Sequence, residues 1–233
     1  MMRDHMELVG LPGAGKSTLV EFLTKAWANA AEAEDLSISS PEPVTPTEFR
    51  KTLISLSARL FFRAPGTTVS LFREEDGKML IRRLAYRLAG VQQRHIKSPA
   101  VHVNSGVLQP LVTFATEDSD LTMDLSDLWH STLNASLATL PQPAVLIYVS
   151  APAPVAQARF IARGRRVTAW GKEVSDGRMT ERFKAGEATC ERIRENCEAR
   201  GSSVFVVDSS SPFEEAMVRD LAVTTSKILC REK

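Results

Sequence analysis

The sequence predicts an α/β protein with a doubly wound, five-stranded parallel sheet flanked by helices. Short apolar segments alternate along the chain with longer segments of helical periodicity. Residues 10–17 (GLPGAGKS) join the first strand and helix, and they fit the G-x-x-x-x-G-K-[S/T] pattern of a phosphate-binding loop. Residues 144–149 (AVLIYV) are apolar throughout, which is typical of a strand buried on both faces.

The remaining elements follow from the same patterns. Strands are expected at residues 7–9, 36–39, 100–103, 144–149 and 204–207. Helices are expected at residues 16–30, 47–63, 69–93, 107–116, 126–140, 154–163, 179–200 and 212–229. The Ala-Pro-Gly sequence at 64–66 separates two of these helices, because proline and glycine interrupt helical runs. Since ligands bind at the carboxyl ends of parallel strands, the segments that follow the strands are expected to share one edge.

Length and composition exclude several classes of protein. The 233 residues, 43% of them hydrophobic, are enough for one domain with a substantial core. A net charge of +1 gives no reason to expect a nucleic acid polymer or a membrane surface as a partner. No apolar run approaches the roughly 20 residues of a membrane span, and no secretory leader is recognised. Three cysteines without a C-x-x-C pattern indicate reduced thiols and a cytoplasmic location.

The phosphate-binding loop predicts a site for ATP and Mg²⁺. Its glycines let backbone N–H groups turn toward phosphate oxygens, and the following helix adds the positive end of its dipole. Lys16 is expected to reach the β- and γ-phosphates, and Ser17 to hold Mg²⁺. A chance glycine-rich turn is the alternative, but the flanking strand and helix argue against it. The expected nucleotide contacts are Gly10, Pro12, Gly13, Ala14, Gly15, Lys16, Ser17 and Thr18.

A second motif, R-x-x-x-R-x-R, comprises Arg159, Arg163 and Arg165 and follows the strand at 144–149. Arg159 and Arg163 are four residues apart on one expected helix, so both point the same way. Guanidinium groups bind phosphate through two parallel hydrogen bonds and offset the charge that develops on a transferred phosphoryl group. The alternative is a basic helix end that is favoured by the helix dipole.

With residues 40–44 (SPEPV), these motifs resemble the nucleoside and nucleotide kinase group of P-loop proteins over nearly the whole chain. The resemblance implies a single P-loop kinase domain over 1–233, with an acceptor-binding helical region at 45–97 and a mobile lid at 159–178. It implies that Glu42 accepts the proton of the attacking hydroxyl, although a polar residue in a proline-stiffened turn is the alternative. The lid arginines would close over the phosphoryl group and the adenine, with Arg163 also contacting the nucleotide.

Two further positions take their interpretation from this resemblance. Asp208 would lie against the adenine, or it belongs to the N-cap region of the last helix, and the two roles are compatible. After the strand at 100–103 the family usually carries an acidic residue followed by arginine, whereas this chain has Asn104 and Ser105. Asn104 can coordinate Mg²⁺ through water. The missing arginine argues against an acceptor of the nucleoside monophosphate type.

The sequence therefore predicts an ATP-dependent kinase that phosphorylates a hydroxyl of a small molecule, with a nucleoside-like acceptor as the first hypothesis. A sugar, a glycan end, or a specialised metabolite such as an antibiotic is the alternative acceptor. A P-loop NTPase switch or a degenerate nucleotide-binding protein is the alternative class. A GTPase would carry the guanine-binding motif, which is absent from the sequence. A separate class of ATPase would carry an acidic Walker B residue, which the strand at 100–103 does not provide. Both absences favour the kinase. The long helices after residue 46 offer a face for a homodimer.

Overall fold

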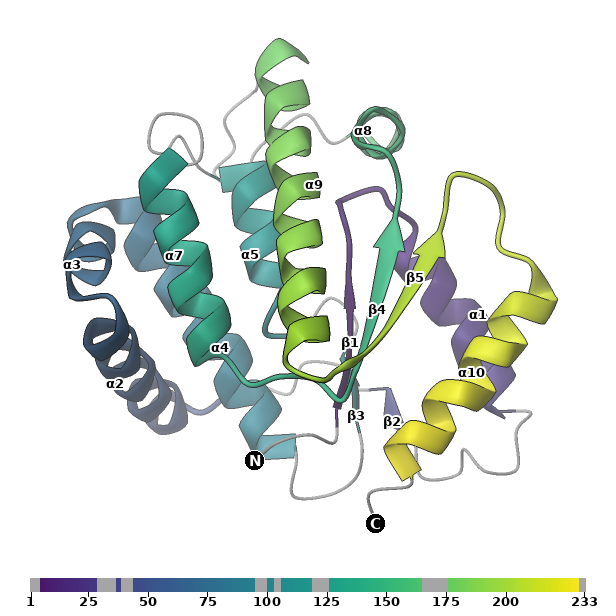
Figure 1. Ribbon diagram of the computed structural model, residues 1–233, viewed down its shortest axis with the longest axis horizontal. Coiled ribbons are helices and arrows are strands. Elements are labelled where there is room, and N and C mark those ends of the chain that lie inside the picture. The colour runs from purple at the N-terminus through teal and green to yellow at the C-terminus, as the bar shows by residue number, and fades with distance from the viewer. Residues whose placement is uncertain are drawn as a thin grey trace.

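The structure, a computed structural model, describes residues 5–28, 37–38, 44–94, 100–102, 106–118, 126–164 and 176–230. Within these ranges five strands form one parallel sheet in the order β2-β3-β1-β4-β5 (Figure 1). The strands are β1 (His5–Val9), β2 (Ser37–Ile38), β3 (Ala100–His102), β4 (Val145–Ser150) and β5 (Ser203–Asp208). The predicted doubly wound, five-stranded parallel sheet is thereby confirmed.

Strand β1 occupies the centre of the sheet. It pairs with β3 through His5 and Ala100 and with β4 through Met6 and Val145. Every residue of β1 is buried, and so are the first five residues of β4, which confirms that β4 is covered on both faces. The loop that follows Val9 therefore starts from the middle of the sheet edge, where neighbouring strand ends can reach it.

Helices cover both faces of the sheet. Helices α1 and α10 pack together on one face, and α5 and α9 lie against the other (Figure 1). Helices α2, α3, α4 and α7 pack together beyond α5, farther from the sheet. The α-helices are α1 (Lys16–Ala28), α2 (Pro46–Arg63), α3 (Pro65–Arg73), α4 (Glu75–Arg94), α5 (Gln109–Thr113), α7 (Ser126–Thr139), α8 (Ala153–Ala162), α9 (Asp176–Ala199) and α10 (Glu215–Cys230). No helix in the described ranges is long and apolar enough to cross a membrane.

Two expected helices differ from the structure. The helix expected at 69–93 is in fact the two helices α3 and α4, which are separated by Glu74 in an extended conformation. A Cβ at Gly77 would lie 2.3 Å from the carbonyl oxygen of Leu71, so glycine allows the start of α4 to approach the end of α3. The helix expected at 107–116 is a short α5 that continues as a π-helix, η1 (Phe114–Asp118).

The start of α2 shows how local sequence sets an element. The Thr45 side chain accepts a hydrogen bond from the backbone N–H of Glu48 at 3.3 Å, and Pro46 occupies the first helical position. Both features stabilise a helix N-terminus. The helix then buries Thr52, Leu56 and Leu60 on one face, a spacing that matches the helical repeat.

Candidate nucleotide and acceptor site

The phosphate-binding loop has a backbone that only glycine fits at its tip. Gly13 and Gly15 have φ values of 85° and 89°, in the left-handed region that other residues rarely adopt. A Cβ at Gly13 would lie 2.3 Å from the carbonyl oxygen of Ala156, so the loop also passes directly against the first turns of α8. The spacing of glycines in the motif thus follows from backbone conformation and from close packing.

Lys16 lies inside the curve of this loop. Its Nζ donates hydrogen bonds to the carbonyl oxygens of Gly10 at 2.7 Å and Leu11 at 2.9 Å, and the residue is 7% exposed. The first backbone N–H groups of a helix have no acceptor within the helix, and α1 has no acidic side chain in its first turn. An ammonium group and a helix N-terminus therefore meet here, which is the arrangement that binds phosphate.

The ends of β4 and β5 close one side of the loop. Ser209 donates from its backbone N–H and its Oγ to the carbonyl oxygen of Ser150, at 2.9 and 3.0 Å. The ring of Phe213 lies 3.5 Å from the position of a Cβ on Gly15 and makes an edge contact with Phe22. The ends of β1, β4 and β5 therefore come together, as predicted for these three segments.

Asp208 folds the loop after β5. Its carboxylate accepts hydrogen bonds from the backbone N–H and the Oγ of Ser210, both at 2.8 Å. These bonds, and to a smaller extent the charge of Arg159, hold the pKa of Asp208 below its ordinary value. Because α10 begins at Glu215, and not at Pro212 as predicted, Asp208 is no part of its N-cap and that interpretation is wrong.

Of the predicted arginines, Arg159 in α8 lies beside the loop after β5. Arg159 is half-buried, and its Nη2 donates to the carbonyl oxygen of Ser210 at 3.3 Å. Arg163 is exposed and forms the C-cap of α8. Three other predicted site residues, Glu42, Asn104 and Arg165, lie outside the described residues. The structure therefore places Arg159 at the ends of β4 and β5, and Arg163 one turn farther along.

A site for Mg²⁺ is compatible with the first turn of α1. In nucleotide sites Mg²⁺ is held by one or two side chains together with phosphate oxygens and water. Ser17 is exposed in the first turn of α1, directly after Lys16, so its hydroxyl is placed to be one of these side-chain ligands. Thr18 is exposed beside it. Among the described residues, no group of three or more His, Cys, Asp or Glu side chains could hold a metal by itself.

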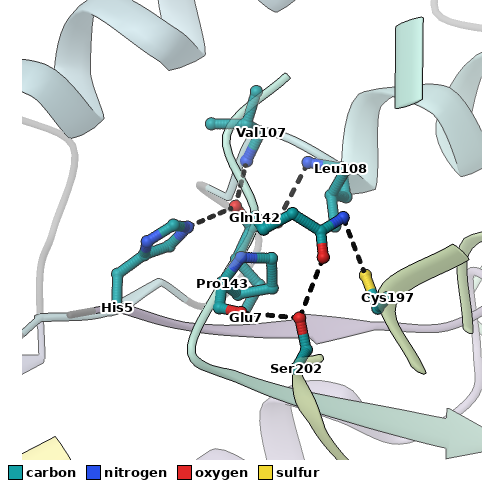
Figure 2. Close-up of polar contacts among 8 residues, drawn as sticks. All are labelled: His5, Glu7, Val107, Leu108, Gln142, Pro143, Cys197 and Ser202. Atoms are coloured by element: carbon teal, nitrogen blue, oxygen red, sulfur yellow. Dashed lines mark hydrogen bonds and ion pairs between the residues drawn. The ribbon is translucent and has the colours of Figure 1, made fainter. Parts of the chain in front are cut away.

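Glu7 is a structural residue of the site that sequence reasoning missed. Its buried carboxylate accepts hydrogen bonds from the backbone N–H groups of Val107 and Leu108, both at 2.9 Å, and contacts His5 Nε2 at 3.2 Å (Figure 2). Burial raises the pKa of Glu7, but the His5 contact and the two N–H groups outweigh burial and leave the pKa below its ordinary value. The available signal was one carboxylate among the apolar residues Met6, Leu8 and Val9.

Gln109 connects the turn held by Glu7 to the phosphate-binding loop. Its Oε1 accepts a hydrogen bond from the backbone N–H of Gly10 at 3.3 Å, and its Nε2 donates to the Gly10 carbonyl oxygen at 3.2 Å. Gln109 is the first residue of α5 and is 7% exposed. The side chain of Glu7 thus fixes the start of α5, and α5 in turn fixes the first residue of the loop. These contacts link residues about a hundred positions apart, and no local pattern predicts them.

A cavity of about 430 Å³ opens between α2, α4 and α5. The rings of Phe49 and Tyr86 lie on its wall with centroids 6.4 Å apart. Gln109 lines this cavity and also binds Gly10, so the cavity and the phosphate-binding loop share one side chain. The lining residues are Phe49, Arg82, Arg83, Tyr86, Arg87, Gln109, Pro110 and Thr113.

The chain matches no protein-family profile and no curated protein sequence. It is similar to solved structures of deoxyadenosine kinase from M. mycoides. The structure with bound dATP has 17% identity and a TM-score of 0.53, and the match covers 95% of this chain and 98% of that chain. The structure with the products dCMP and dCDP has 17% identity and a TM-score of 0.53, over 94% and 97% of the two chains. The predicted kinase-like fold is thereby confirmed over nearly the whole chain.

Proposed function

We propose that this protein is an ATP-dependent phosphotransferase that moves the γ-phosphoryl group of ATP to a hydroxyl of a small molecule. The observation that carries the proposal is Gln109, which binds the phosphate-binding loop and lines the neighbouring cavity. A donor site and an acceptor site that share a wall are what phosphoryl transfer requires, because the reaction depends on positioning. The fold shared with deoxyadenosine kinases supports this proposal.

The proposed roles follow the residues around the loop. Residues 13–17 and the Lys16 ammonium hold the β- and γ-phosphates, and Arg159, Arg163 and Arg165 offset charge on the transferred group. Mg²⁺, held by Ser17 with Asn104 as an outer ligand, would neutralise charge on the phosphate oxygens. The acceptor oxygen bonds to the γ-phosphorus as the bond from that phosphorus to the β–γ bridging oxygen breaks, and ADP leaves. Glu42 takes the hydroxyl proton.

The acceptor is proposed to enter the cavity beside α4, within the helical region at 45–97. Phe49 and Tyr86 place two aromatic rings, tilted 58° to each other, in the cavity lining, and an acceptor ring that packs against either of them is consistent with a nucleoside-like acceptor. A sugar, a glycan end or a specialised metabolite is the alternative acceptor. Residues 159–178 are proposed to act as the lid over the nucleotide.

We also propose that the protein acts as a cytoplasmic homodimer. The described thiols of Cys190 and Cys197 are free and buried, which suits a reducing compartment. Large apolar side chains on α2 are exposed, with Ile54 at 71% and Phe62 at 85%, and a second copy could cover them.

Acceptor-dependent turnover of ATP tests the proposed reaction. ADP release with Mg²⁺ is measured against a panel of nucleosides, sugars and aminoglycoside-type compounds for the wild type, Lys16→Ala and the matched control Lys25→Ala. Lys25 is exposed in the last turn of the same helix. We expect one acceptor class to stimulate ADP release, and we expect Lys16→Ala alone to abolish it. Tight ATP binding without stimulation by any acceptor would instead favour a nucleotide-dependent switch or a degenerate nucleotide binder.

A further inference from the structure

The wall of the cavity beside α4 carries three arginines, namely Arg82, Arg83 and Arg87. Arg83 and Arg87 are four residues apart, so they lie on one face of the helix, and both are half-buried. No carboxylate is found among the described residues that line the cavity. The whole chain has a net charge of only +1, so a general excess of basic residues does not explain this concentration of positive charge.

A neutral acceptor gives no reason for this arrangement. Arginines on a solvated helix face need no ligand, and exposed Arg82, whose charge acts on Glu75, fits that description. The half-buried residues Arg83 and Arg87 line a partly enclosed space, where charge is less screened than in water. Both residues also interact with the protein, but a guanidinium has five N–H donors and can bind an anion at the same time.

We propose that the acceptor is an anion whose phosphate or carboxylate group binds Arg83 and Arg87 while its ring lies against Phe49 and Tyr86. This inference rests on the proposed function, because it assigns the cavity to the acceptor. Guanidinium groups suit phosphate and carboxylate through paired hydrogen bonds. The arginine that is missing after Asn104 would follow the strand at 100–103, and its absence argued against a phosphorylated acceptor. Arg83 and Arg87 come from α4 instead, so they offer positive charge to the acceptor from a different part of the fold.

Binding of matched neutral and anionic compounds tests this charge preference. The protein is saturated with Mg²⁺ and a non-hydrolysable ATP analogue, so that the probes cannot occupy the nucleotide site. Adenosine is compared with adenosine 3′-monophosphate, and glucose with glucose 6-phosphate and glucuronate, by titration calorimetry at about 150 mM salt. We expect at least one anionic compound to bind about 10-fold or more tightly than its neutral partner. The phosphate and carboxylate probes distinguish the two anionic groups.

Substitutions in α4 test whether Arg83 and Arg87 cause the preference for anionic compounds. Arg83→Gln and Arg87→Gln are expected to weaken binding of the anionic probe by about 10- to 100-fold, which is the usual effect of losing a charged hydrogen bond. The control Arg59→Gln removes the same charge from an exposed position on α2 and should leave binding unchanged. Unchanged affinity for the ATP analogue shows that each variant is folded, and Arg83→Lys, which keeps the charge, should retain part of the binding.

Two results of the binding experiments would overturn the inference. The first is that no anionic compound binds more tightly than its neutral partner. The second is that the arginine variants bind the anionic probe as well as the wild type does. Turnover is a separate readout, so the two proposals can fail independently. Phosphorylation of a neutral acceptor with an unchanged KM in Arg83→Gln would refute the anionic acceptor and support the kinase. Anion binding that depends on Arg83 and Arg87, without any ADP release, would support the anion site and contradict the proposed kinase activity.

Discussion

Replacing Glu7 with glutamine should destabilise the fold, because the carboxylate is buried among hydrogen-bond donors. It accepts from the N–H groups of Val107 and Leu108 and contacts His5. Glutamine keeps the shape but replaces one oxygen with an NH₂ group, which would then face a backbone N–H and leave it without an acceptor. A buried unpaired donor costs about 1–3 kcal/mol, and a hydrogen bond to a charged group contributes about 1.5–3 kcal/mol. We therefore expect Glu7→Gln to lower the free energy of unfolding by about 2–4 kcal/mol.

Urea unfolding at neutral pH measures this change. The slope of the free energy with urea should stay constant, since the variant buries the same surface, while the midpoint falls. The matched control is Glu48→Gln, whose carboxylate is partly exposed and pairs with Lys51 on the surface of α2. We expect the control to lie within about 0.5 kcal/mol of the wild type. A loss below about 1 kcal/mol in Glu7→Gln would refute the argument that this carboxylate holds the start of α5.

The same residue makes stability depend on pH in a direction that can be checked. The pKa of Glu7 in the folded protein lies below the ordinary value of 4.5. Its contribution is therefore complete above about pH 4.5 and is lost as the pH falls through the folded pKa. The difference in stability between the wild type and Glu7→Gln should narrow as the pH falls below 4.5. If the difference in free energy of unfolding between the wild type and Glu7→Gln stays constant down to the pH at which Glu48→Gln unfolds, the ionised Glu7 carboxylate is not its cause.

Three further predictions concern the loop and the thiols. Gly13→Ala should weaken ATP binding about 10-fold or more, because its φ is 85° and its Cβ would lie 2.3 Å from a carbonyl of α8. ATP-dependent thermal shifts measure this, and Gly66→Ala, whose Cβ meets nothing within 4 Å, should behave as the wild type. Gln109→Ala should lower the free energy of unfolding by about 1–3 kcal/mol, because both backbone polar groups of the first loop glycine lose a partner; an unchanged urea midpoint would contradict this. Burial raises the pKa of Cys190 and Cys197 to about 12, so both thiols should resist iodoacetamide at about pH 8 in the folded protein and react once it unfolds. Peptide mapping by mass spectrometry checks this. Rapid labelling of either cysteine in the folded protein would show that its thiol is accessible to solvent, which would contradict the prediction.

Local sequence predicted most of the secondary structure because each element has its own pattern. The strand at β4 is a continuous apolar run, and the loop at 10–17 combines glycines with Lys16 between a strand and a helix. The strand ends at Ser150 and Asp208 also met the loop as the parallel sheet predicts. The division of 69–93 into α3 and α4 was not predictable in this way, since it depends on how closely Gly77 approaches Leu71 in space.

The sequence by itself determined that this is a P-loop α/β fold with a phosphate-binding loop between its first strand and first helix, because those features arise from periodicity and from neighbouring residues. Only the tertiary structure decided the position of the loop at the centre of the sheet, the side chains that hold it there, and those that line the neighbouring cavity. Glu7, Gln109 and the arginines of α4 have ordinary local sequence contexts, and they reach the site through contacts between distant segments. The physical reason is that burial and hydrogen-bond partners are properties of the packed chain, whereas propensity and spacing are properties of each segment.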